Sequence, residues 1–136
     1  MKYFKFISRS LIVLALLCSC VDYPEAYTMI HLYNSTNAPI YVYHQFVNGN
    51  DSITVQGIYR IDTIKPYRRP LLASRLNRLL LSEKFHLLVY DEDTYNQFGI
   101  EGIRENNISP KLYYVMPGTK FNTYAYIIEY NGETIK

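Results

Sequence analysis

The sequence predicts a mainly β protein: a small two-sheet sandwich, immunoglobulin-like or transthyretin-like, with one or two short helical insertions. A small α+β roll is the alternative. Tyr is unusually frequent, at 15 of 136 residues, and Trp is absent; Tyr packs well on the half-buried face of a sheet. Apolar residues alternate with their neighbours in several short segments. Six Pro and six Gly are scattered along the chain, as expected where turns separate short strands.

Two strands are expected first, at residues 28–33 and 40–46, with the turn-forming sequence NSTNAP (34–39) between them. In the first strand, Ile30 and Leu32 share one face, and the second strand has two alternating faces. The members of those two faces are Ile40, Val42, His44 and Phe46 on one side and Tyr41, Tyr43 and Gln45 on the other. Their closeness in sequence predicts a β-hairpin.

The next segments predict a loop, an extended stretch and a helix. The loop is VNGNDS (47–52), and residues 53–64 form the extended stretch, in which the isolated Gly57 indicates a bulge. KPYRRP (65–70) ends that stretch. In LLASRLNRLLL (71–81) the leucines fall at helical spacing and the arginines lie opposite them, so we expect a short helix that begins near Pro70.

The C-terminal half begins with the most apolar segment after residue 20, FHLLVY (85–90), which predicts a central strand. DEDT (91–94) ends this strand and offers Asp93 or Thr94 as a helix N-cap. Residues 94–107 contain two glycines, which weaken any helix prediction there. KLYYVM (111–116), a Pro117-Gly118 turn and NTYAYIIEY (122–130) predict a closing hairpin.

The N-terminus has the pattern of a secretory signal: a basic segment followed by an uncharged apolar run at residues 11–17. As a helix this run would extend only about 10 Å, too little for the ~30 Å hydrocarbon core of a membrane. The sequence Leu17-Cys18-Ser19-Cys20 follows it. This sequence resembles the lipobox of bacterial lipoproteins, in which a small residue precedes the lipidated cysteine.

The resemblance implies that the signal is cleaved before Cys20, that Cys20 carries the lipid, and that Cys18 is lost with the signal. The chain then divides into a signal peptide (1–19), a lipidated cysteine with a short tether (20–27) and a single β-rich domain (28–136). The resemblance also implies a small Gram-negative envelope lipoprotein. Val21 rather than Asp follows the cysteine, which favours the outer membrane, in its periplasmic leaflet or at the cell surface.

The residues after the predicted cleavage point carry no motif for catalysis. They number 117 and have a formal charge of −1, so a basic excess for nucleic acid is absent. The three histidines, at 31, 44 and 86, lie in separate expected strands, without a metal-binding or nucleophile motif. We therefore expect no enzyme and no cofactor. The alternative is an envelope hydrolase that uses Asp91 or Asp93 with a histidine.

Asp91 and Asp93 also raise the question of a metal, because carboxylates gathered at the end of a strand can bind Ca²⁺. Helix capping and loop solubility explain the same residues without a metal. The glycine and distal glutamate of an EF-hand loop are absent. The prediction is therefore no metal site, with these two residues as the weak calcium candidate.

Two further features indicate a binding surface. Residues 60–84 carry seven cations against two acids, among them Arg68 and Arg69, which suits acidic glycans or anionic headgroups but also an ordinary solvated face. Tyrosines that share strand faces form flat platforms for sugars or proteins, or else fill the core. The tyrosines proposed for binding are Tyr41, Tyr43, Tyr124 and Tyr126.

These features together favour a non-enzymatic binding or assembly module, held at the membrane by a lipid anchor. Its expected partner is a glycan or another envelope protein. A fimbrial or surface-assembly subunit remains an alternative, which an unpaired strand edge would favour.

Overall fold

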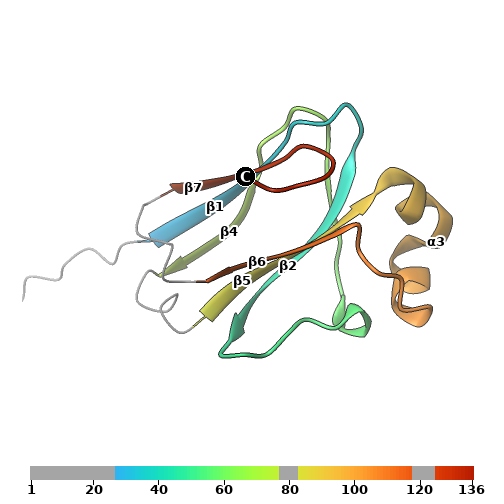
Figure 1. Ribbon diagram of the computed structural model, residues 1–136, viewed down its shortest axis with the longest axis horizontal. Helices are drawn as coiled ribbons and strands as arrows, with labels where there is room; N and C mark the ends of the chain where they lie inside the picture. Colours follow the sequence, from blue (N-terminus) through green and yellow to red (C-terminus); the bar gives the residue numbers. More distant parts are fainter. Residues whose placement is uncertain (1–26, 77–82, 118–124) are drawn as a thin grey trace, which may run out of the picture.

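The computed structural model describes residues 27–76, 83–117 and 125–136, and it is a two-sheet sandwich, as the sequence predicts (Figure 1). The three-stranded sheet has the order β4-β1-β7 and the four-stranded sheet the order β3-β2-β5-β6. The first sheet contains β1 (Tyr27–Asn34), β4 (Leu71–Leu76) and β7 (Ala125–Tyr130). The second contains β2 (Ile40–Asn48), β3 (Asp62–Ile64), β5 (Glu83–Asp91) and β6 (Leu112–Pro117).

Two helical elements accompany the sheets: the 3-10 turn η1 (Val55–Gly57) and the helix α3 (Glu92–Glu105). Within the described ranges no helix is long and apolar enough to cross a membrane. The predicted signal peptide, Cys18 and Cys20 lie outside the described residues, as do residues 77–82 and 118–124.

The main core lies between the two sheets and follows the predicted alternation. Ile30 and Leu32 of β1 are buried, and so are Ile40 and Val42 of β2, because successive residues of a strand point to opposite faces. Phe85, Leu87 and Val89 of β5 complete the opposite wall. The prediction of a central strand at residues 85–90 is confirmed, since β5 is paired on both sides and buried along this length.

A second core covers the other face of the four-stranded sheet. Leu88 and Tyr90 of β5 point away from the first core and pack with Tyr43, Ile58 and Ile103. Ile103 is the buried residue of α3, which lies beside this sheet and away from the three-stranded sheet (Figure 1). The four-stranded sheet is therefore covered on both faces.

The two predicted hairpins are wrong. β1 pairs with β4 and β7, whereas β2 pairs with β3 and β5, so the turn at residues 34–39 carries the chain from one sheet to the other. The buried side-chain amide of Asn34 explains this crossing, because its nitrogen donates to Ala38 O (2.9 Å) and to Ile64 O of β3 (3.1 Å). β6 and β7 likewise belong to different sheets.

The helix predicted at residues 71–81 is also wrong over its described part, because residues 71–76 form β4. This strand pairs with β1, and its register shifts between Ile30 and His31, so that Leu72 and Ala73 both pack against the core. Burial against the sheet thus overrides the helical spacing of the leucines.

The long helix forms instead at α3, in the segment that the glycines made ambiguous. Its N-cap is Asp91, whose carboxylate accepts a hydrogen bond from Thr94 N (2.9 Å), and not Asp93 or Thr94. Gly99 interrupts the helix at φ 59°, where glycine is favoured and other residues are strained. The second glycine stays inside the helix because packing against the sheet compensates for its low propensity.

Residues 53–64 do not form the expected extended stretch with a bulge. Gly57 ends the 3-10 turn η1, and only the last three residues pair as β3. The apolar side chains Ile53, Val55 and Ile58 pack in the second core. This segment therefore covers a sheet face instead of lengthening the sheet.

Candidate functional site

A cleft of about 430 Å³ opens at the edge of the sandwich between the strands β2 and β3 of one sheet and β4 of the other. It forms because β3 is short and pairs only with Ile40–Val42, which leaves the following part of β2 beside the opening. Among the described residues, three separate chain segments line it. The lining residues are Tyr43, His44, Tyr59, Arg60, Asp62, Thr63, Ile64, Pro70, Leu71 and Leu72.

The polar part of the cleft is built on the pairing of β2 with β3. Asp62 lies opposite Val42, so its side chain is on the same face as His44, two residues further along β2. Arg60 donates from Nε to Asp62 Oδ1 (2.9 Å), and its Nη2 forms an ion pair with the same oxygen (2.8 Å). His44 Nε2 lies 3.8 Å from Asp62 Oδ2. One carboxylate thus lies between a guanidinium and an imidazole.

Burial lowers the pKa of His44 below its ordinary value. Asp62 opposes this effect because its negative charge favours the imidazolium, whereas Arg60 adds to it. His44 is therefore neutral at pH 7, with one ring nitrogen that donates and one that accepts a hydrogen bond. The cleft thus offers a cation, an anion and a neutral imidazole within a short distance.

An exposed aromatic ring lies beside these polar groups. Tyr59 is 73% exposed, and its ring meets that of Tyr43 edge-on, with centroids 5.6 Å apart. Tyr43 itself is buried and donates from its hydroxyl to Gln45 Oε1 (2.9 Å). Leu71, at the opposite wall, is exposed. Sites for small polar ligands commonly combine an exposed aromatic ring with neighbouring hydrogen-bonding groups.

The tyrosines proposed for binding do not come together. Tyr41 stacks on Tyr95 of α3, with centroids 3.9 Å apart, and Tyr43 is only 3% exposed in the second core. Tyr126 packs against the core between the sheets, and Tyr124 lies outside the described residues. Tyr43 thus belongs to the second core, and Tyr41 and Tyr126 are partly buried and pack against the two cores, which is the other role that the sequence allowed.

Arg68 and Arg69, in contrast, are exposed beside the cleft. Together with Lys65 they border a second depression, of about 450 Å³, whose wall includes Thr63, Ile64 and Pro70. These last three residues also line the first cleft. The structure therefore places Arg68 and Arg69 next to the polar cleft, whereas Tyr43 is the predicted site residue that lines the cleft itself.

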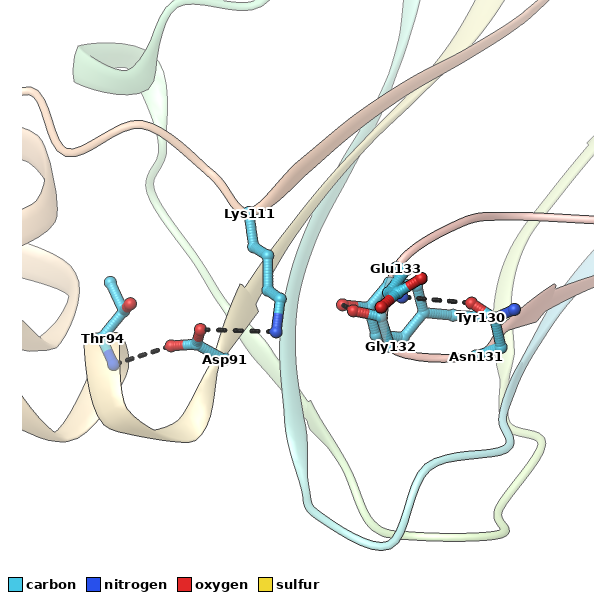
Figure 2. Close-up of polar contacts among 7 residues, drawn as sticks. All are labelled: Asp91, Thr94, Lys111, Tyr130, Asn131, Gly132 and Glu133. Atoms are coloured by element: carbon cyan, nitrogen blue, oxygen red, sulfur yellow. Dashed lines mark hydrogen bonds and ion pairs between the residues drawn. The ribbon is translucent and has the colours of Figure 1, made fainter.

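Asp91 and Asp93 serve the start of α3. Figure 2 shows the Asp91 carboxylate directed at the backbone nitrogen of Thr94, with Lys111 Nζ 3.8 Å from the other oxygen. The hydrogen bonds from Thr94 lower the pKa of Asp91, and Lys111 contributes in the same direction. Asp93 is exposed in the first turn of the helix. Among the described residues, no group of three or more His, Cys, Asp and Glu side chains is placed to hold a metal ion.

The remaining histidines lie on different sheets. His86 is buried on the helix-covered face of β5, where its Nδ1 lies 2.6 Å from the Tyr113 hydroxyl oxygen. His31 lies on β1, in the row between Leu71 and Ile127. The histidine that has a carboxylate neighbour in the cleft is His44, and that neighbour is Asp62, not Asp91 or Asp93.

Sequence reasoning missed Tyr59 and Asp62. A signal for Asp62 exists, because Arg60 and Asp62 are two positions apart in the stretch that was expected to be extended, and alternate strand residues share a face. The contribution of His44 could not be found in this way, since it depends on the pairing of β2 with β3.

Comparison with known proteins identified no relative of this chain. No family model matches the chain, and neither the curated proteins nor the solved structures gave a match.

Proposed function

We propose that this chain is an envelope lipoprotein, anchored through Cys20 in the outer membrane, whose β-sandwich is a non-enzymatic module that binds a glycan in the cleft beside β3. The observation that carries the proposal is the exposed ring of Tyr59 next to the Arg60–Asp62 pair and His44. Sugars present apolar ring faces and several hydroxyl groups. Such a ligand fits an aromatic face combined with charged groups that donate and accept hydrogen bonds.

The contacts of Asp62 favour binding over catalysis. Arg60 holds one of its oxygens through a hydrogen bond from Nε and an ion-pair contact from Nη2, which fixes the position of the carboxylate. The 3.8 Å separation of Asp62 Oδ2 from His44 Nε2 is longer than a hydrogen bond. A hydrolase built on Asp91 or Asp93 has no support in the cleft, since neither residue lines it.

The ligand proposal is tested on a glycan array with the full-length protein in detergent. We expect a set of glycans to be retained and the Tyr59→Ala variant to bind them at least tenfold more weakly, because the exposed stacking surface is lost. Tyr27→Ala is the matched control, since Tyr27 is also an exposed tyrosine, 51% exposed, but lies on β1 outside the cleft. Equal losses in the two variants, or unchanged binding by Tyr59→Ala, would contradict the proposal.

The anchor is tested separately by labelling cells with a fatty-acid analogue. We expect Cys20→Ala to abolish the label and to release the protein from membranes, whereas Cys18→Ala changes neither. Labelling that persists without Cys20 would exclude the lipobox interpretation. Membrane fractionation and protease treatment of intact cells then test the outer membrane and distinguish its two leaflets.

A further inference from the structure

The depression next to the cleft is bordered by three cations within five positions of the chain. Lys65, Arg68 and Arg69 all line it, and in the described part of the chain none of their side chains forms an ion pair. Arg60, a few residues earlier, is paired with Asp62. Like charges that are close together repel each other, and an anion bound between them relieves this repulsion.

The backbone that carries these cations is held in place by the buried residue Asn34. Asn34 N donates to Arg68 O (3.0 Å), Asn34 O accepts from Tyr67 N (2.8 Å), and Asn34 Nδ2 donates to Ile64 O (3.1 Å). Arg68 N closes the turn on Lys65 O (3.3 Å). A turn fixed on both sides loses little conformational freedom when a ligand binds, which favours affinity.

Tyr67, at the tip of this turn, has a strained backbone. Its φ is 56°, in the left-handed region, which is unfavourable for a residue other than glycine. The side chain is 62% exposed, so burial of the ring does not compensate for that cost. The conformation brings Lys65 and Arg68 to the same depression. Backbone strain of this kind is concentrated at functional sites.

The two depressions adjoin and differ in charge. They share the wall formed by Thr63, Ile64 and Pro70. The first contains Arg60 and Asp62, whose charges balance. The second has three cations and no carboxylate among the described residues that line it. A ligand that extends from one to the other would meet a neutral site followed by a cationic one.

We propose that the turn Lys65–Pro70 is an anion-binding subsite, which takes the carboxylate or sulfate group of an acidic oligosaccharide whose neighbouring sugar lies in the cleft. This inference rests on the proposed function and specifies its ligand class. Arg68 and Arg69 are suited to the role because a guanidinium can bind carboxylate or sulfate oxygens through two parallel hydrogen bonds. An anionic lipid headgroup has related charge, but the wall shared with the cleft favours a chain-like ligand over a membrane surface.

The test uses the full-length protein in detergent and probes matched in everything but charge. Binding is measured for hexamers of galacturonic acid and of chondroitin sulfate, and for the corresponding uncharged hexamers, methyl-esterified and, for chondroitin, also desulfated. We expect an acidic hexamer to bind at least tenfold more tightly than its uncharged counterpart, and the difference to shrink as salt is raised. The Arg68→Gln/Arg69→Gln variant should lose this difference and bind the uncharged hexamer within twofold of the native protein. Arg104→Gln, an exposed arginine outside both depressions, is the control.

The outcomes separate the two proposals. If the Arg68/Arg69 variant keeps the preference for acidic hexamers, or if native protein shows no such preference, the anion subsite is wrong while the cleft proposal stands. If no hexamer binds, both proposals are wrong for these glycans, and the subsite is rejected as a glycan site. The last measurement uses vesicles that contain phosphatidylglycerol. If the protein binds these vesicles but no hexamer, and if vesicle binding requires Arg68 and Arg69, the cations contact the membrane surface instead of a glycan.

Discussion

The two sheets of this protein differ in how many of their faces are covered. The four-stranded sheet lies between the core of the sandwich and a second layer, made by α3, η1 and the segment that joins β2 to β3. The described residues cover the three-stranded sheet on one face only, and its other face exposes Met29, Leu71 and Ile127. Strands with the same alternating pattern can therefore lie in a sheet that is covered on both faces or on one, depending on what packs on the second face.

The largest effect is expected in the core between the sheets, to which both contribute. Leu87 is fully buried there, and Leu87→Ala should lower the free energy of unfolding by about 4 kcal/mol, since it removes buried methyl groups and leaves a cavity. Urea denaturation followed by circular dichroism measures this change. A loss below about 1 kcal/mol would show that the sheets are not packed through this residue.

A smaller and more local effect is expected on the helix-covered face. Ile103 is the buried residue of α3. Ile103→Ala should lower the free energy of unfolding by about 2–3 kcal/mol, which is toward the low end for such substitutions. The reason is that a helix at the edge of the domain can shift to fill part of the cavity. Amide hydrogen exchange should rise in residues 92–105 before it rises in β5. Equal acceleration in both elements would mean that the second layer unfolds together with the sandwich, and that the two faces are not separable.

The covered face also predicts a dependence of stability on pH. Burial lowers the pKa of His86, and Lys84 adds to the shift. The imidazole of His86 therefore takes up a proton near pH 6.5 in the unfolded chain but remains neutral there in the folded protein. The free energy of unfolding should therefore fall as the pH is lowered through about 6.5, because the unfolded state binds more protons there. His44, whose pKa is also lowered by burial, contributes in the same direction.

Replacement of the buried histidine separates its contribution. His86→Phe removes the titration, so its unfolding free energy should change less between pH 7.5 and pH 5.5 than that of the native protein. The slope is compared and not the absolute stability, because the variant also loses the contact with Tyr113. Identical slopes in the two proteins would show that His86 is not the group that titrates.

The smallest effect is expected on the uncovered face. Ile127 is 50% exposed while its neighbour Ile128 is buried in the core. Ile127→Thr should change the free energy of unfolding by less than about 0.5 kcal/mol, as surface substitutions usually do, whereas Ile128→Thr should cost several times more. If Ile127→Thr is as costly as Ile128→Thr, the outer face of the three-stranded sheet is covered in solution, and the contrast between the sheets does not hold.

Several elements could be predicted from the sequence because local alternation determines them. The faces of β1 and β2 follow from the period of two, and the central position of β5 follows from its continuous apolar run. Composition correctly indicated a mainly β sandwich. For the candidate site, Arg68 and Arg69 were found because a cluster of cations is visible as a cluster in the sequence.

Other elements depended on contacts between residues that are far apart in the chain. The leucines of residues 71–76 have helical spacing, but pairing with β1 makes this segment a strand. The segment with two glycines becomes a helix because its apolar side chains can pack on the four-stranded sheet. Pattern and propensity are weak preferences, and burial against a partner outweighs both.

The sequence by itself determined which residues of most strands share a face, and it also predicted the class of fold. The tertiary structure decided which sheet each strand joins, that Tyr41 and Tyr43 pack in the second core, and that His44 lies beside Asp62 in a cleft. The physical reason is that alternation states only that a face is apolar. What covers that face is settled by packing among the sheets and the helix, where the free energy of burial is gained.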